Sequence, residues 1–277
     1  MKTESTSQQI ESYQREGWLI IADFLTPNEL GELCSAIDAA VTQMGTTRIA
    51  DGGESNKSQV IGVDSYYDRV FLQRVNLWKI NDTIRKYFQS PDLGKLLCKL
   101  AGVDGIRVWH DQTLQKRAWD NPTSWHIDDP NWSFYSPDAI SIWIALDDAT
   151  IQNGCMYYLP GSHKLTNYEK KGHFGENMGA LFDEYPEFKE IEPVASEMRA
   201  GSAGFHNGLT AHAAGPNMTP HPRRAMTCIY MPEGSTYNGR QNVLSDEQVD
   251  SLNIGDVLDD ESQTPLVWSN RSAASSV

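Results

Sequence analysis

Residues 123–129 read TSWHIDD and place a histidine and an aspartate one residue apart, at His126 and Asp128. On a β-strand, residues i and i+2 point to the same face of the sheet, so the imidazole and the carboxylate would lie side by side. They offer two ligands for a divalent transition metal, and one further histidine would complete a two-histidine, one-carboxylate site. With seven histidines and 37 acidic residues, about one such pair arises by chance, so an ordinary strand is the competing interpretation.

The segment HNGLTAHAAGPNMTPHPRRAM (206–226) supplies further groups of the required types. His212 precedes a Gly-Pro-Asn turn, and Arg223 and Arg224 follow it. A hairpin here would therefore place the histidine and one arginine facing the same space. Because a guanidinium binds a carboxylate through two parallel hydrogen bonds, an arginine suits a dicarboxylic cosubstrate. Two histidines, one carboxylate and an arginine are the set that an oxygenase using Fe(II) and 2-oxoglutarate requires.

The elements that must position these residues are short strands. After Gly105, apolar or alternating runs recur between Gly, Pro and Asn turn signals. They cover residues 106–116, 124–128, 139–146, 155–161, 201–207 and 226–232. This spacing predicts an all-β sandwich or a jelly roll.

The N-terminal part is expected to contribute mainly helices. WLIIADFL (18–25) reads as a buried strand, and TPNE (26–29) predicts a capped start for an amphipathic helix over 27–43. Residues 44–59 read as a loop, and a second helical region is expected over about 80–101. The acidic tail from about residue 244 reads as a helix, a lid or a loose end. A single domain is predicted, because no repeat or linker divides the chain.

Composition narrows the class of partner. The formal net charge is -14 and the sequence pI is near 4.8, which argues against nucleic acid and anionic membranes as partners. Four scattered cysteines give neither a disulfide framework nor a zinc spacing. The polar N-terminus lacks the apolar core of a signal peptide, so a cytoplasmic protein acting on a small molecule is expected. The pattern gives no indication of the oligomeric state.

With these motifs in place, the sequence resembles the phytanoyl-CoA dioxygenase family of Fe(II)/2-oxoglutarate oxygenases. The matching stretches are YQREGWLIIADFLTPNEL (13–30), HDQTLQK (110–116), WHID (125–128), IWIALDDATIQNGCMYYLPGSHK (142–164) and HAAGPNMTPHPRRA (212–225). Their order and spacing are far more specific than H-x-D alone. The resemblance implies a mainly β fold, a cupin-like double-stranded β-helix with N-terminal helices outside. It places the core at about 13–232 within one domain over 1–277.

The resemblance also implies roles for individual residues. His126, Asp128 and His212 match the iron ligands. Arg223, eleven residues after His212, matches the arginine that binds the distal carboxylate of 2-oxoglutarate. Arg224 is the poorer match, since neighbouring residues of a strand face opposite ways.

Three more residues are expected at the cosubstrate. Trp143 matches an aromatic position beside it, Gln112 a position that contacts it, and Lys116 lies near the same pocket. Some family members carry a small hydroxyl residue two positions after the distal histidine, where this chain has Ala214. One hydrogen bond to the cosubstrate is therefore missing here or supplied elsewhere.

The residues after the H-x-D pair allow two interpretations. Asp129, Trp132 and Phe134 form either a wall of the substrate pocket or part of the core. Of the remaining histidines, His206 is read as structural, although its spacing from His212 would let it face the site.

The reaction implied by the resemblance is hydroxylation, or a related oxidation, of an unactivated C–H bond. It consumes O2 and 2-oxoglutarate and yields succinate and CO2. Iron halogenases of similar fold have a small residue in place of the carboxylate, so Asp128 argues for hydroxylation. Two alternatives remain. A zinc or manganese hydrolase or isomerase could use the same three ligands, and a cupin-like binding protein could retain the fold without catalysis.

Overall fold

The computed structural model describes residues 1–50, 66–170, 172 and 175–270. Its strands are β1 Trp18–Ile21, β2 Leu72–Val75, β3 Gly105–Lys116, β4 Thr123–His126, β5 Ile140–Ala145, β6 Met156–Tyr158, β7 Val194–Ser196, β8 Ala203–Asn207, β9 His212–Ala214, β10 Arg223–Pro232 and β11 Leu266–Ser269. Its α-helices are α1 Ser7–Glu16, α2 Pro27–Met44, α4 Asp82–Phe88, α5 Pro91–Ala101, α6 Ala180–Glu184 and α7 Asp246–Ser251.

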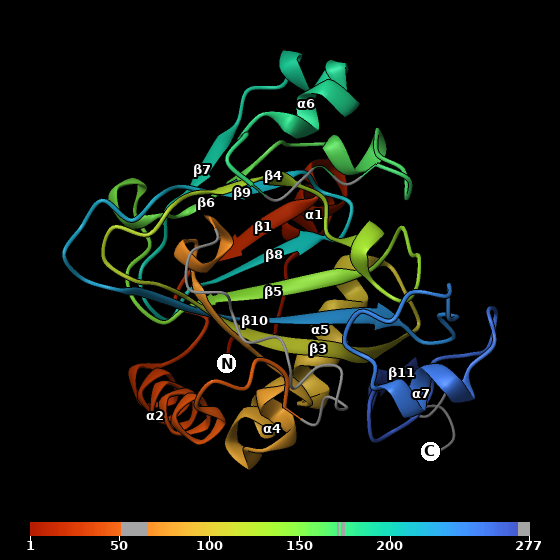
Figure 1. Ribbon diagram of the computed structural model, residues 1–277. Helices are drawn as coiled ribbons and strands as arrows, with labels where there is room; N and C mark the ends of the chain where they lie inside the picture. The colour runs from red at the N-terminus through yellow and green to blue at the C-terminus, as the bar shows by residue number, and fades with distance from the viewer. Residues whose placement is uncertain (51–65, 171, 173–174, 271–277) are drawn as a thin grey trace.

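The strands form two antiparallel sheets that face each other (Figure 1). The large sheet runs β1-β8-β5-β10-β3-β11, and β2 also pairs with β3. The small sheet runs β4-β9-β6-β7. Helices α2, α4 and α5 lie against the outer side of the large sheet. The predicted jelly roll, mainly β with N-terminal helices outside, is confirmed.

The main core lies between those helices and the large sheet. Outward side chains of the sheet, such as Ile142 and Phe205, pack with Leu33 of α2 and Leu97 of α5 in one buried cluster. Burying such a side chain contributes about 1.5–3 kcal/mol. This packing fixes the large sheet and leaves its inner face free to form one wall of the space between the sheets.

The N-terminal elements follow the sequence with some corrections. Helix α2 has the predicted capping box, in which the Thr26 hydroxyl accepts from the backbone N–H of Glu29. The strand expected over 18–25 covers only β1, because Asp23 takes a positive φ of 49° and turns the chain. The helical region at 80–101 is two helices, since Pro91 can begin a helix but cannot continue one. Helix α1 was not predicted. The loop expected over 44–59 extends beyond the described residues.

A β-bulge in β3 decides which of its side chains face the site. Ile229 pairs with His110 and Tyr230 pairs with Val108, so the residue between them, Trp109, is extra. Before the bulge, Val108 packs into the helix-side core. After it, Gln112 lines the cavity between the sheets, although strict alternation would put both on one face.

The described part of the acidic tail, residues 244–270, packs on the rest of the fold and adds one strand to the large sheet. Strand β11 pairs with the beginning of β3, and Val267 is buried in the helix-side core. Leu244 and Leu258 pack in a second buried cluster with Trp109. Of the three interpretations for this tail, a loose end is therefore wrong for residues 244–270. Within the described ranges, no helix combines the length and the apolar character needed to cross a bilayer.

The capping box of α2 gives a stability prediction. Thr26→Ala removes the acceptor for the Glu29 N–H, and we expect the free energy of unfolding to fall by about 1 kcal/mol. Urea unfolding followed by circular dichroism would measure it. Ser35→Ala is the matched control, because this exposed hydroxyl bonds a carbonyl within the same helix, and its loss should change stability by less than about 0.5 kcal/mol. Equal effects of the two substitutions would contradict the capping role.

Candidate metal and cosubstrate site

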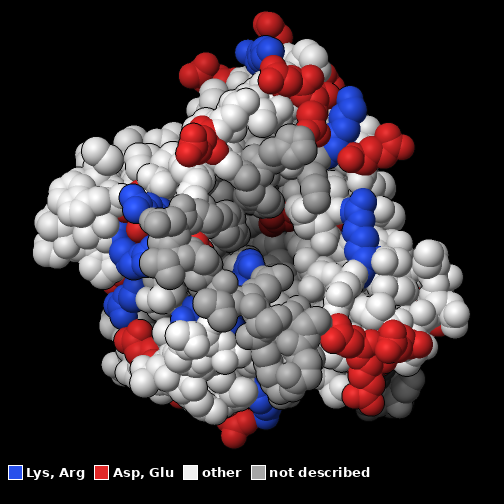
Figure 2. Space-filling model, viewed as in Figure 1, with Lys and Arg blue, Asp and Glu red and all other residues white. Residues whose placement is uncertain are grey.

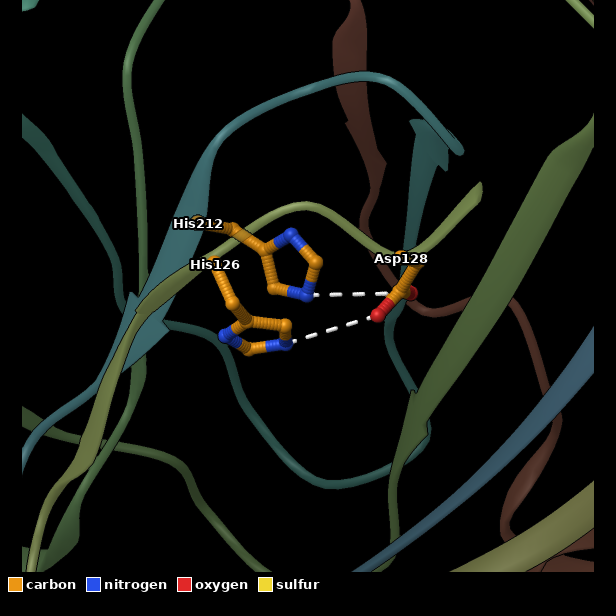
Figure 3. Close-up of side chains that lie close together, drawn as sticks. All are labelled: His126, Asp128 and His212. Atoms are coloured by element: carbon orange, nitrogen blue, oxygen red, sulfur yellow. Dashed lines mark ion pairs between the residues drawn. The ribbon is translucent and has the colours of Figure 1, made fainter. Parts of the chain in front are cut away.

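Three predicted ligand residues meet between the sheets. His126 is the last residue of β4, His212 is the first of β9, and the two are paired in the register of the small sheet. Their ring centroids lie 4.1 Å apart. Ligand atoms of His126, Asp128 and His212 all lie within 4.8 Å of one another, and Figure 3 shows the three side chains pointing toward one another.

Asp128 reaches this position by a turn and not along a strand. The strand expected over 124–128 ends at His126, and Asp128 has helical backbone angles (φ -80°, ψ -49°). Its backbone N–H donates to the Gly208 carbonyl at 3.2 Å. The side chain between them, Ile127, points into a separate apolar cluster. The predicted convergence of histidine and aspartate is thus present, but the i, i+2 strand geometry is wrong.

Both histidines are held in the same tautomer. Nδ1 of His126 lies 2.8 Å from the Ser124 carbonyl, and Nδ1 of His212 lies 2.9 Å from the Thr210 carbonyl. Because a carbonyl can only accept, each Nδ1 carries a proton, and in the neutral ring the lone pair is at Nε2. Burial, followed by the nearby His126, lowers the pKa of His212 to about 3, so this imidazole is neutral near pH 7.

The result is a convergence of acceptors. Nε2 of His126 lies 3.4 Å from Oδ1 of Asp128, and Nε2 of His212 lies 3.8 Å from Oδ2. Two lone pairs and a carboxylate repel one another in a buried space unless a cation lies between them. Two neutral imidazoles and a carboxylate are also the donor set of a non-haem iron centre, so these residues fit such a metal.

A third histidine, His206 on β8, completes the surroundings of Asp128. Its Nε2 lies 3.6 Å from Oδ2 of Asp128, and its Nδ1 lies 3.2 Å from the hydroxyl of Tyr158. Nε2 lies outside the three-residue ligand cluster and has no hydrogen-bond partner among the described residues. His206 therefore lies beside the carboxylate, on the side of the large sheet. The sequence analysis preferred a structural role for His206, but the residue lies next to the ligand cluster.

The three residues open into a cavity of about 130 Å³ between the sheets. The face drawn in Figure 2 is hollowed near its centre, and both acidic and basic side chains are visible in the hollow. Arg223, Trp143 and Gln112, which the resemblance assigned to the cosubstrate, line this cavity.

Arg223 is a buried cation that has no carboxylate partner among the described residues. Only 2% of the residue is exposed, and burial lowers its pKa to about 10. Its guanidinium donates to the Gly154 carbonyl at 2.9 Å and lies 5.2 Å from the centre of the Trp143 ring. Its Nε has no hydrogen-bond partner, and no carboxylate within ion-pair distance is found among the described residues. A buried arginine of this kind suits an anionic ligand.

The neighbouring Arg224 faces the other way. It pairs with Asp147 at 2.9 Å and with Asp38 at 3.2 Å, outside the cavity. This agrees with strand alternation, which distinguished the two arginines in the sequence. The predicted hairpin is wrong, however, because His212 lies on the small sheet and Arg223 lies on the large one. The two residues face one cavity from opposite walls.

Trp143 and Gln112 occupy one row across the large sheet. Thr227 pairs with Gln112 on one side and with Trp143 on the other, and all three line the cavity. The Trp143 Nε1 is buried and has no hydrogen-bond partner in the part of the chain that the structure describes. Trp143 and Arg223, each with a buried donor that has no partner among the described residues, line the same cavity, which fits a ligand rich in acceptor oxygens.

The four residues expected with least support lie outside the cavity lining. Lys116 is fully buried, and its ammonium donates to the carbonyls of Val70 and Asn121. Asp129 is buried and accepts the backbone N–H of Ser136. Trp132 and Phe134 stack on each other in a buried cluster. These positions favour a packing role over a substrate wall.

Sequence analysis missed Gln73, Phe71 and Thr227, which also line the cavity. Gln73 and Phe71 come from the segment around β2, which pairs with β3 only in the folded chain. Thr227 could have been found, because it follows Arg223 by four residues and shares its face on a strand.

A jelly roll with two histidines, a carboxylate and an arginine at one cavity is the architecture of an oxygenase that uses Fe(II) and 2-oxoglutarate. The family model "Phytanoyl-CoA dioxygenase (PhyH)" matches residues 13–225. The chain therefore belongs to the phytanoyl-CoA dioxygenase family, and it is an Fe(II)/2-oxoglutarate-dependent oxygenase.

Similar proteins carry out different reactions. A probable alpha-ketoglutarate-dependent hypophosphite dioxygenase of Stutzerimonas stutzeri is 26% identical over 236 residues, which cover 81% of this chain and 78% of that protein. The carbocyclase SnoK of nogalamycin biosynthesis has a TM-score of 0.75 at 26% identity, covering 95% of this chain and 97% of that chain. The epimerase SnoN has a TM-score of 0.71 at 23% identity, covering 94% and 97%, which shows the shared fold.

A buried histidine near the site gives a prediction for the metal-free protein. Burial lowers the pKa of His110 from 6.5 to about 4, so the unfolded chain binds more protons between these values. The stability contributed by neutral His110 is complete above pH 6.5 and is lost as the pH falls toward 4, by about 2 kcal/mol at pH 5.

The measurement is urea unfolding at pH 7 and pH 5 for the wild type and His110→Gln. The variant should lose less stability than the wild type over this interval, because glutamine does not titrate. His221→Gln, at an exposed position, should behave as the wild type does. A pH dependence that is unchanged by His110→Gln would show that His110 does not contribute.

Proposed function

We propose that this oxygenase hydroxylates an unactivated C–H bond of a small organic molecule, with 2-oxoglutarate converted to succinate and CO2. The observation that carries the proposal is the pair of unmatched sites in one cavity. Acceptors converge at His126, Asp128 and His212, and the Arg223 cation has no carboxylate partner among the described residues. A metal dication and a dicarboxylate satisfy both. We also propose that the chain forms a single oxygenase domain.

In this proposal His126, Asp128 and His212 hold Fe(II), and Arg223 holds the distal carboxylate of 2-oxoglutarate. Iron and 2-oxoglutarate together supply the oxidising chemistry by which O2 reacts with a C–H bond. The protein contributes position and environment. The carbonyls of Ser124 and Thr210 keep both imidazoles in the ligand tautomer. Trp143 and Thr227 are buried, so the part of the cavity wall that they form would exclude water from the cosubstrate.

The carboxylate of Asp128 favours hydroxylation over halogenation, because it occupies the position that a halide would need. Carbocyclization and epimerization are the alternatives, because proteins of similar structure carry out these reactions. Either reaction would take place in the same cavity. Product analysis separates them. A hydroxylated product gains one oxygen atom from O2, whereas ring closure or epimerization adds none.

The decisive experiment is an anaerobic titration of the protein with Fe(II) and 2-oxoglutarate. We expect a weak visible charge-transfer band in the wild type, because the proposed site leaves positions for the keto acid to chelate iron. His212→Ala should abolish the band, since one of three ligands is lost. His221→Ala, at an exposed position, should retain it. Tight zinc binding without a band would instead favour the hydrolase or isomerase, and no metal binding at all would favour the binding protein.

Arg223 and Arg224 offer a matched pair for testing the cosubstrate site. Arg223→Met should weaken 2-oxoglutarate binding about 100-fold, because it removes a buried partner of a carboxylate. Arg224→Met, one residue away but paired with Asp147 outside the cavity, should change the affinity by less than about threefold. Calorimetry on the Mn(II)-loaded protein measures both. Similar losses in the two variants would remove Arg223 from the proposed role.

A further inference from the structure

A chain of polar side chains leads from Arg48 into the cavity. Nε of Arg48 donates to Oε1 of Gln73 at 2.8 Å, and a second guanidinium nitrogen donates to the same oxygen. Nε2 of Gln73 in turn donates to Oε1 of Gln112. Gln73 and Gln112 both line the cavity, whereas Arg48 is half-buried behind them.

The backbone holds these three residues on adjacent segments. The Arg48 carbonyl accepts from the N–H of Val75 on β2, which places Arg48 along that strand. Gln112 on β3 pairs directly with Val75, so Gln73 is its diagonal neighbour on the same face. Long side chains reach each other across such a diagonal. The chain of hydrogen bonds therefore runs across three neighbouring backbone segments.

Arg48 determines which group donates and which accepts in each hydrogen bond that joins Arg48, Gln73 and Gln112. A guanidinium has donors and no acceptor, so Gln73 must turn its oxygen toward Arg48. The amide nitrogen of Gln73 then points toward Gln112, and the side-chain oxygen of Gln112 must accept its hydrogen bond. As a result, the amide nitrogen of Gln112 is the end that remains for the cavity, and it has no acceptor among the described residues.

We propose that Arg48 and Gln73 are positioning residues that fix Gln112 as a hydrogen-bond donor to a carboxylate oxygen of 2-oxoglutarate. This inference rests on the proposed function, because it assigns the ligand of the same cavity. Gln112 stands in one row with Thr227 and Trp143, and Trp143 lies beside the Arg223 guanidinium. A donor at Gln112 extends the donor-rich wall, whereas an acceptor there would repel a dianion.

Reversing the polarity of Gln73 tests the proposal. A glutamate at this position still pairs with Arg48 but can no longer donate to Gln112. Gln112 would then turn its nitrogen toward the glutamate and its oxygen toward the cavity. Gln73→Glu should therefore weaken 2-oxoglutarate binding about as much as Gln112→Leu, roughly 10-fold or more for a hydrogen bond to a charged group. Gln73→Met leaves Gln112 free to keep its donor in place and should cost less than about threefold.

A double-mutant cycle separates polarity from added charge. If the relay acts through Gln112, Gln73→Glu has no further effect in a Gln112→Leu background. If the new carboxylate repels the cosubstrate directly, the loss is the same in both backgrounds, and the proposal is overturned. It is also overturned if Gln73→Glu binds as the wild type or only as weakly as Gln73→Met.

The readout is calorimetric affinity for 2-oxoglutarate on the Mn(II)-loaded full chain, so it does not depend on turnover. Thermal unfolding and Mn(II) affinity of each variant establish that the fold and the metal site persist. A wild-type protein that binds Mn(II) but not 2-oxoglutarate would refute the proposed function itself. That result is distinguishable from a failure of the relay, in which the wild type binds and the polarity of Gln73 has no effect.

Discussion

One cavity contains a cluster of hydrogen-bond acceptors on one wall and a cation on the other, and the two do not neutralise each other. The rest of the structure holds these two groups apart. On one wall, imidazole lone pairs of His126 and His212 converge on the carboxylate of Asp128. On the other wall, Arg223 is buried without an acid among the described residues. Each arrangement alone is costly in a medium of low dielectric constant. A scaffold that collapsed would bring the two together and neutralise them, so the cavity must be held open.

The jelly roll holds them apart by dividing them between its sheets. The histidines belong to the small sheet and Arg223 belongs to the large one. The large sheet is fixed from behind by α2, α4 and α5, whose apolar side chains pack on its outer face. Asp111, on β3, strengthens this attachment, because its carboxylate accepts the backbone N–H groups of Leu77 and Trp78 at 2.6 and 2.8 Å. Rigid backing of this kind allows the inner face to carry polar residues that pack poorly.

The same architecture explains which features were readable from the sequence. The ligand types follow from donor chemistry, and strand alternation shows that Arg223 and Arg224 face opposite ways, whereas the choice of Arg223 came from the family resemblance. The capping box of α2 is equally local, and it was found. Each of these depends on residues within a few positions of one another. The family resemblance added the distant pairing of His126 with His212.

What the sequence could not supply depends on contacts between distant segments. The bulge at Trp109 changes the face of Gln112, and nothing in the alternation of residues 106–116 marks it. The turn at Asp128 is held by the Gly208 carbonyl, 80 residues away along the chain. The family resemblance placed Lys116 near the cosubstrate pocket, yet its fully buried ammonium donates to two backbone carbonyls. Tertiary hydrogen bonds override local expectation at all three positions.

The hydrogen bonds at the cavity wall extend this reasoning from position to polarity. A glutamine amide can present either end to a ligand, so its identity does not decide what it recognises. Arg48 removes that freedom through Gln73, because a guanidinium cannot accept. The cavity then receives donors from Gln112, Trp143 and Arg223 on one wall and acceptors from the histidine and aspartate cluster on the other. A ligand set in which an anion and a cation touch each other is the arrangement that satisfies both walls at once. That complementarity follows from the protein's own hydrogen-bonding chemistry, independently of the family to which the chain belongs.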